Sequence, residues 1–447
     1  MNAIRTGIVG WILGLLSLAP VSWAAPAGPA LPYHSHDTSV GVVNCASSLC
    51  HGSIGEWKGS DVLRNEYVTW SRLDKHARAY DVLLDERAQQ IARKLGLHGP
   101  AQEQKSCLDC HAQNVPAKLR GERFKLSDGV SCEACHGPAE RWIASHVEPG
   151  ASHASNTAHG LYPANGNRER AQLCLSCHLG NADRFVNHRM MAAGHPRMSF
   201  ELETFTAIAP AHFRVDADYL QRKPAGDGVK TWAIGQALAV SEMMDTLVDP
   251  KRGHDGMFPE LVLFDCHACH HPMSQRRWQA KPAFAGGPGP GVVPLNDSGM
   301  LMVRAIASQV DPKLGERVAR QVVRLQRAAA GQGDVHHEAM ALKAIVQEVA
   351  TRVEAHAFSE SALRGIALAL VDDGLAGNYG DYAGAEQAAM AIGSVVDFMY
   401  KRGLLRAAQP VNAGLARLND SLADDEHYQP AVFRQRLREF RLLLVAK

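Results

Sequence analysis

The stretch "SCEACHGP" at residues 131–138 holds two cysteines, Cys132 and Cys135, and a histidine, His136, directly after the second. The same C-x-x-C-H pattern occurs three more times, as "CLDCH" from residue 107, "CLSCH" from residue 174 and "CHACH" from residue 266. A longer version, "CASSLCH", begins at residue 45. The chain of 447 residues has ten cysteines, and every one belongs to one of these five motifs.

Three kinds of site use paired cysteines. Disulfides suit an exported protein with an even number of cysteines, but they place no demand on the following residue. Histidine fills 22 of the 447 positions, so five trailing histidines by chance have a probability on the order of 3 in 10⁷. Zinc ribbons also use C-x-x-C pairs, and the gap from Cys110 to Cys132 is close to their spacing, but they need no histidine after each pair.

Covalently bound c-type haem explains every feature of the five motifs. The two thiols of C-x-x-C-H form thioethers with the haem, and the histidine binds the iron. The spacing i, i+3, i+4 places the three side chains on one side of a helical turn, whereas C-x₄-C-H needs a looser loop. The sequence therefore predicts five haem c groups. The predicted attachment and iron-binding residues are Cys45, Cys50 and His51; Cys107, Cys110 and His111; Cys132, Cys135 and His136; Cys174, Cys177 and His178; and Cys266, Cys269 and His270.

The residues around the first four motifs resemble the cytochrome c554 family of multihaem cytochromes. The matching stretches are "NCASSLCH" followed by "YVTWSRLDKHARAY", then "SCLDCH", "GVSCEACHGPAERWIASH" and "QLCLSCH", within roughly residues 40–200. The resemblance implies a tetrahaem domain over this part of the chain. The C-x₄-C-H form of the first motif, the fifth motif and the long C-terminal tail depart from the family pattern.

Each iron can take a second axial ligand from elsewhere in the chain. The resemblance implies His76 in "DKHARAY" and His146 in "RWIASH" for this role. His188 and His195 in "NHRMMAAGHP" lie seven residues apart, near one helical face, and are further candidates. Six other histidines in the haem-bearing part have less support and stay open as ligands: His34, His36, His212, His254, His267 and His271.

The N-terminus and the charge balance indicate the compartment and the kinds of partner. Residues 1–24 have a basic residue, a short apolar run and a small-residue pattern before Ala25, which predicts a cleaved secretory signal peptide and a periplasmic protein. An uncleaved membrane anchor is the alternative for this segment. No later stretch is apolar enough to span a membrane, so we expect no integral span in the mature chain. Lys and Arg number 47 against 46 Asp and Glu, which gives no indication of nucleic-acid binding.

The composition changes along the chain and predicts a mainly α fold with much irregular loop. Residues 25–280 carry all five motifs between loops rich in Gly, Pro and Asn, so we expect a multihaem cytochrome c domain there. The stretch "KPAFAGGPGPGVVP" at 281–294 predicts a linker. Residues 295–447 lack cysteine and have apolar residues at helical spacing, which predicts a haem-free bundle of about five or six helices. These apolar positions are Val318, Val322 and Leu325; Leu342, Ile345, Val349 and Val353; and Phe433, Leu437, Phe440 and Leu444.

Two functions are compatible with five haems in one exported chain. Two histidines on an iron leave no position for a substrate, and such a protein carries electrons between respiratory redox partner proteins. The alternative is an oxidoreductase of a small nitrogen or sulfur compound, which needs one haem with an open axial position. The chain has no C-x-x-C-K, the lysine-ligated motif of pentahaem nitrite reductases. The absence of this motif argues against the oxidoreductase but does not exclude it, so we expect an electron-transfer protein.

Overall fold

The computed structural model describes residues 29–60, 62–271, 280–405 and 408–445. The predicted signal peptide, residues 1–24, lies outside these ranges. Helices dominate the described residues, and the strands β1 (His254–Asp255) and β2 (Phe258–Pro259) form one short antiparallel hairpin. The predicted fold class, mainly α with much irregular loop, is confirmed. Within the described ranges no helix is long and apolar enough to cross a membrane.

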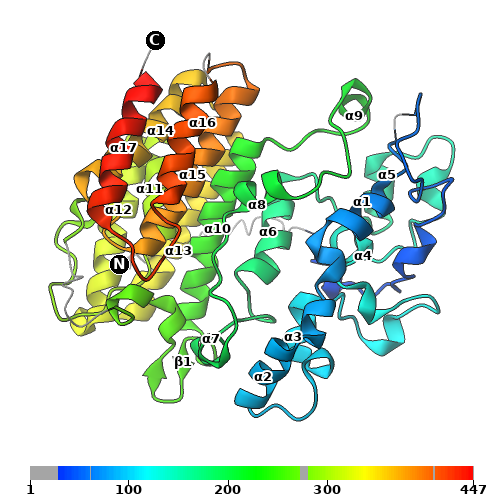
Figure 1. Ribbon diagram of the computed structural model, residues 1–447, viewed down its shortest axis with the longest axis horizontal. Coiled ribbons are helices and arrows are strands. Elements are labelled where there is room, and N and C mark those ends of the chain that lie inside the picture. Colours follow the sequence, from blue (N-terminus) through cyan, green and yellow to red (C-terminus); the bar gives the residue numbers. More distant parts are fainter. Residues whose placement is uncertain (1–28, 61, 272–279, 406–407, 446–447) are drawn as a thin grey trace, which may run out of the picture.

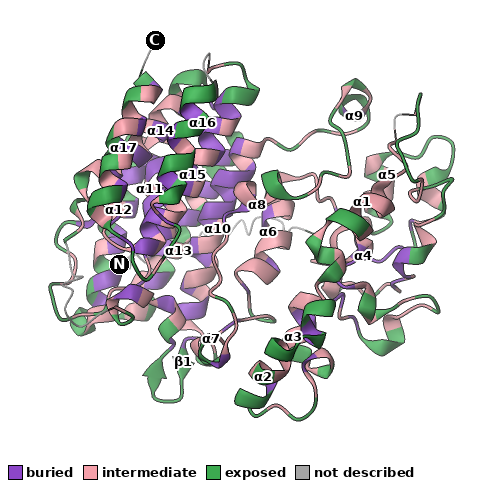
Figure 2. Ribbon diagram, in the orientation of Figure 1, coloured by how far each residue is buried: buried purple, intermediate pink, exposed green. Residues whose placement is uncertain are grey.

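The part of the chain before residue 225 consists of short helices, 3-10 turns and loops (Figure 1). Its one compact group of buried apolar side chains is small and lies where α2, α3 and the neighbouring 3-10 turns meet. Most other residues in this part are half-buried or exposed, as Figure 2 shows. Its α-helices are α1 (Glu66–Leu73), α2 (Glu86–Lys94), α3 (Lys105–His111), α4 (Cys132–His136), α5 (His153–Ala158), α6 (Asn167–His178), α7 (His188–Ala193), α8 (Leu202–Ile208) and α9 (Ala217–Arg222).

Long helices packed side by side make up most of the rest of the chain (Figure 1). Seven of them follow residue 294 within the described ranges, more than the five or six predicted. The positions with helical apolar spacing are buried on α12, α13 and α17, except Ile345, which is partly buried. The long helices are α10 (Gly228–Val248), α11 (Ser298–Val310), α12 (Pro312–Arg327), α13 (Val335–Ala355), α14 (Glu360–Ala376), α15 (Tyr382–Lys401), α16 (Ala408–Asp420) and α17 (Pro430–Val445).

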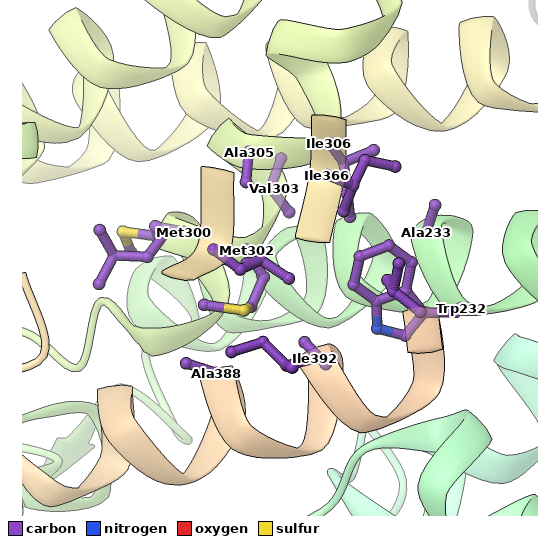
Figure 3. Close-up of a cluster of buried hydrophobic side chains, with 14 of the residues drawn as sticks. Trp232, Ala233, Met300, Met302, Val303, Ala305, Ile306, Ile366, Ala388 and Ile392 are labelled. Atoms are coloured by element: carbon purple, nitrogen blue, oxygen red, sulfur yellow. The ribbon is translucent and has the colours of Figure 1, made fainter. Parts of the chain in front are cut away.

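One continuous apolar core joins α10 to the helices that follow it. Trp232 of α10, Met302 of α11 and Ile392 of α15 are fully buried in this core (Figure 3). Helix α10 packs against α13 and α11 on one side and against α6 on the other. It therefore connects the bundle to the part of the chain that carries the cysteine motifs, although it precedes the Pro/Gly-rich segment 281–294.

The segment 281–294 is attached to the bundle at its start. The Lys281 side chain is only 18% exposed, and its Nζ lies 2.5 Å from Asp297 Oδ1 and 2.6 Å from Asp381 Oδ2. Burial alone lowers the pKa of Lys281, but the two carboxylates outweigh it and raise that pKa above its usual value. Phe284 is buried, and the backbone N–H of Ala283 donates to Asn378 Oδ1 (2.8 Å). These contacts join the segment to the N-termini of α11 and α15.

Candidate functional site

The five cysteine motifs adopt the local structures that their spacing predicts. Three motifs lie on α-helical turns, in α3, α4 and the last turn of α6. The fifth forms a tight turn in which the His270 backbone N–H donates to the Cys266 carbonyl oxygen (2.8 Å). The longer first motif is a loop, where the N–H groups of Cys50 and Gly52 both donate to the Ser47 carbonyl oxygen (2.9 Å each). We number the sites 1 to 5 in chain order, by the motif histidines His51, His111, His136, His178 and His270.

Each motif histidine lies next to one histidine from elsewhere in the chain. The second histidines come from the 3-10 turns η3 (Lys75–Arg78) and η8 (Ser145–Val147), the start of α7 and the loops after α7 and α8, so each pair joins segments that are distant in sequence. The ring-centroid distances are 6.4 Å for His51–His146, 6.5 Å for His111–His195, 6.1 Å for His136–His212, 6.0 Å for His178–His76 and 6.3 Å for His270–His188.

These distances fit two imidazoles that bind one metal ion from opposite sides. A metal–nitrogen bond of about 2 Å on each side places the two ring centroids about 6 Å apart. Among the described residues no three His, Cys, Asp or Glu side chains gather closely enough to hold a metal ion by themselves. A structural zinc ion needs four such ligands, whereas haem iron needs two beyond the porphyrin nitrogens. The donor set therefore fits haem and does not fit zinc.

Hydrogen bonds to Nδ1 orient five of the ten paired imidazoles. His51 Nδ1 lies 3.0 Å from Glu66 Oε2, and His76 Nδ1 lies 2.9 Å from Asp74 Oδ1. In three more histidines Nδ1 donates to a backbone carbonyl oxygen, a contact that leaves Nε2 for a metal ion. These three contacts are His111 to Ala79 (3.0 Å), His146 to Ile143 (2.6 Å) and His195 to Pro196 (2.8 Å).

Burial and neighbouring carboxylates shift the pKa values of the paired histidines in two directions. Burial lowers the pKa of His136 and of His178 to about 4, so both are neutral at pH 7, the form in which imidazole binds metal. The hydrogen bonds that His51 donates to Glu66 and that His76 donates to Asp74 raise the pKa of each of these histidines. A carboxylate in this position also makes an imidazole a more basic metal ligand.

Neighbouring cysteines bring pairs of sites together. All ten cysteines lie in the described part of the chain, and none forms a disulfide. Cys45 lies beside Cys132, and Cys110 lies beside Cys177. Site 1 is therefore next to site 3, and site 2 is next to site 4.

Glu133, which lies between the two cysteines of site 3, also holds site 1 against it. Its buried carboxylate accepts hydrogen bonds from the backbone N–H groups of Val40 (2.9 Å) and Gly41 (2.8 Å), which precede site 1, and of Ala139 (2.7 Å). Gly41 and Gly137 have positive φ, and a Cβ at either would collide with backbone oxygen. Gly41 lies close against the Arg123 backbone and Gly137 close against the Gly160 backbone, and both approaches require glycine.

Two buried indole N–H groups near the sites have no acceptor among the described residues. Trp142 packs edge-on to His146 of site 1, with ring centroids 5.5 Å apart, and its Nε1 is unpaired. Trp232 Nε1 is also unpaired, and its side chain lines a cavity of about 180 Å³. This cavity is largely apolar and extends from His178 of site 4 to Cys266 of site 5. The unpaired indole N–H of Trp232 therefore lies at a largely apolar space between sites 4 and 5.

The candidate second ligands have different surroundings. His76, His146, His188 and His195 each lie next to a motif histidine. His212, which has no distinctive flanking sequence and was among the candidates with less support, lies next to His136.

The remaining candidates lie elsewhere. The His34 ring bonds to Asp183 (2.9 Å), His36 is exposed, and His254 is exposed on β1. His267 is buried, with its ring 5.6 Å from that of Tyr382, and His271 is half-buried after the fifth motif.

Comparison with known proteins identifies the part of the chain around sites 1 to 3. The family described as cytochrome c554 and c-prime matches residues 43–137. These residues form a cytochrome c554 family domain. The match covers the motifs of sites 1, 2 and 3. Membership implies covalently bound c-type haem and is consistent with a multihaem electron carrier. Searches among curated proteins and among solved structures returned no match.

Proposed function

We propose that the protein is a pentahaem c-type cytochrome that carries electrons between redox partner proteins, with two histidines on every iron. The five histidine pairs, each with ring centroids 6.0–6.5 Å apart, support this proposal best. Each pair contains one histidine directly after a cysteine motif. The cysteine pairs at sites 1 to 5 attach the haems, and the family domain at residues 43–137 makes this attachment the expected chemistry.

In this proposal the chain's own residues bind the iron, exclude a substrate from it and hold the imidazole planes in place. When bound, each haem supplies an iron that takes up and releases a single electron. The paired imidazoles would hold the iron and so would exclude a substrate from it. Glu66, Asp74 and the backbone carbonyl oxygens at Nδ1 hold the imidazole planes in place. Because these ligands are held rigidly, the structure changes little when the iron gains or loses an electron.

Contacts between sites support transfer along the chain of haems. Neighbouring cysteines bring site 1 next to site 3 and site 2 next to site 4, and the cavity from His178 to Cys266 links site 4 to site 5. Electrons would arrive from one redox protein at one end of this series and leave to another at the other end. We further propose that residues 1–24 direct the chain to the periplasm, that residues 25–280 carry the haem sites, with α10 packed into the bundle core, and that the segment 281–294 leads to haem-free helices at 295–447.

Electron paramagnetic resonance of the oxidised protein, with a pyridine haemochrome assay to count haems, tests the proposal. We expect five haems per chain and only low-spin signals. The imidazole planes are 15° and 35° apart in the His51–His146 and His270–His188 pairs and 85–89° apart in the other three. Perpendicular planes leave two iron d orbitals nearly degenerate, so we expect three strongly anisotropic signals and two rhombic ones.

The variant His212→Ala makes the test specific to one site. We expect it to convert one of the three strongly anisotropic signals to a high-spin signal, because His136 would lose its partner. His34→Ala is the matched control and should leave all five signals unchanged, since His34 bonds to Asp183. A high-spin signal in the wild-type protein that shifts on adding nitrite or nitric oxide would contradict the proposal and favour the oxidoreductase.

A further inference from the structure

One face of α15 contacts the segment that follows His195. Glu386 and Gln387 are neighbours on α15 and lie eight and seven residues before Ser394, about two helical turns, so the three side chains share one side of the helix. The opposite side of α15 is apolar and packs in the bundle core, where Figure 3 shows Ala388 and Ile392. The helix therefore belongs to the haem-free bundle but directs a polar stripe toward the haem sites.

The strongest contact of this stripe is a double hydrogen bond between Arg197 and Glu386. Arg197 Nη1 lies 2.9 Å from Glu386 Oε2, and Arg197 Nη2 lies 3.0 Å from Glu386 Oε1. Both side chains are largely shielded from solvent, with 29% and 19% exposed. Burial acts to lower the pKa of Arg197, but the Glu386 carboxylate outweighs it and raises that pKa. Two parallel hydrogen bonds that are shielded from solvent fix the orientation of the Arg197 side chain better than a surface ion pair would.

Two further contacts extend the attachment along the same segment. Gln387 Nε2 donates to the Phe200 carbonyl oxygen (3.1 Å), and Ser394 Oγ donates to the buried Glu201 Oε2 (2.8 Å). The Phe200 ring in turn stacks on His178 of site 4, with centroids 4.3 Å apart. The stripe on α15 thus holds a segment that touches site 4 and begins two residues after the paired histidine of site 2.

The residue before His195 in the chain, Gly194, is attached to the haem-bearing part. Arg87 of α2 donates two hydrogen bonds to the Gly194 carbonyl oxygen, from Nε (3.0 Å) and Nη2 (2.7 Å). Gly194 has a φ of +122°, which a side chain would disfavour, and it ends α7 immediately before His195. His195 therefore lies between two anchors, Arg87 at Gly194 and Glu386 at Arg197.

We propose that the helical bundle positions the second iron ligand of site 2, and that Glu386 is its positioning residue. This inference rests on the proposed function, because it assumes that His195 binds the iron opposite His111. Without Glu386, the segment after His195 loses the double hydrogen bond at Arg197 but keeps its contacts at Phe200 and Glu201, and His195 leaves the iron more readily. The bundle, which carries no haem, would then act on haem chemistry through one helix face.

Carbon monoxide binding to the fully reduced protein tests this role. Carbon monoxide can bind a bis-histidine haem only after a histidine leaves, so its affinity reports how firmly His195 is held. We expect Glu386→Ala to bind carbon monoxide at one haem about tenfold more tightly than the wild-type protein does, the scale of other second-layer ligand effects. Glu386→Gln, which keeps one acceptor for Arg197, should lie between the two.

Two control variants separate the outcomes. Glu348→Ala removes another bundle carboxylate that bonds to arginines, Arg317 and Arg352, far in sequence from α15, and it should match the wild-type protein. His195→Ala should open one haem completely. If His195→Ala opens no haem, both the ligand assignment and this inference fail. If it opens one haem but Glu386→Ala binds carbon monoxide like the wild-type protein and Glu348→Ala, only the positioning role is overturned.

Discussion

The two parts of this chain fill their interiors in different ways. The bundle from α10 onward has a continuous core of buried aliphatic and aromatic side chains. The part that carries the motifs has, apart from residues that join this core, one cluster of five buried apolar residues: Leu83, Ala92, Ala101, Leu108 and Ala112. All ten paired histidines lie between residues 51 and 270.

This difference shows what each part needs in order to fold. Close-packed apolar side chains stabilise a domain by removing their surface from water. The bundle contains such a set, whereas a five-residue cluster is far too small to offset the conformational entropy of the residues around it. The haem-bearing part therefore depends on its cofactors for most of its stability, and the bundle does not.

The largest expected effect comes from withholding haem. We expect the haem-free chain, produced where haem attachment cannot occur, to keep slow hydrogen exchange in α10 to α17. In the haem-bearing part we expect exchange to accelerate by at least a thousandfold, because α1 to α5 would lose the groups that they pack around. Hydrogen–deuterium exchange followed by peptide mass spectrometry measures both parts in one sample.

The holoprotein in the same buffer is the control for this exchange experiment. Slow exchange in α2 and α3 of the haem-free chain would show that the small cluster at Leu83 and Leu108 suffices for folding. The contrast between the two parts would then be wrong. Fast exchange throughout the bundle would contradict the other half of the comparison.

Much of the fold and of the site could be predicted from local sequence. The motif turns at α3, α4 and α6 follow from cysteine spacing, and the buried positions of α12 and α17 follow from apolar periodicity. Both patterns repeat within a few residues, so a linear reading detects them. His76 and His146 were found through flanking residues shared with the family.

The rest depends on contacts between distant segments. His212 lies 76 residues beyond His136, and nothing in "PAHFR" marks it as a partner. His188 and His195 were expected near one helical face, but α7 ends at Ala193, and the two histidines pair at different sites. The role of α10 in the bundle core was also missed, because it precedes a segment that reads as a linker.

The next largest effect is expected where segment 281–294 meets the bundle. Lys281→Met leaves Asp297 and Asp381 buried without their ammonium partner, and we expect a loss of about 3–5 kcal/mol in the free energy of unfolding of the bundle. Chemical denaturation of the holoprotein, followed by circular dichroism, measures it. Since the unpaired carboxylates can be neutralised by protons, the loss should be smaller at pH 4 than at pH 7.

Lys343→Met is the matched control for this variant. Its Nζ pairs with Asp245 across α13 and α10 (2.6 Å), but both side chains are partly exposed, and we expect a loss of about 1 kcal/mol or less. Equal effects of the two substitutions would show that the contact at Lys281 is an ordinary surface ion pair. The segment 281–294 would then act as a free linker, as its composition predicts.

The smallest effect concerns Glu203, on α8 between the two parts. Its Oε1 is buried without a hydrogen-bond partner in the described structure, and burial raises the pKa of this carboxyl to about 7. Between pH 4.5, the pKa of this carboxyl in the unfolded chain, and about pH 7, the folded protein binds a proton that the unfolded chain does not. The free energy of unfolding therefore falls as pH rises through that window. We expect Glu203→Gln to increase the free energy of unfolding by about 1–3 kcal/mol at pH 8 and to have little effect at pH 4. Thermal unfolding at both pH values checks this, with Glu316→Gln on the exposed face of α12 as the control. An equal gain at both pH values would mean that the amide packs better than the acid. Folding of the junction between the haem-bearing part and the bundle would then involve no proton uptake at Glu203.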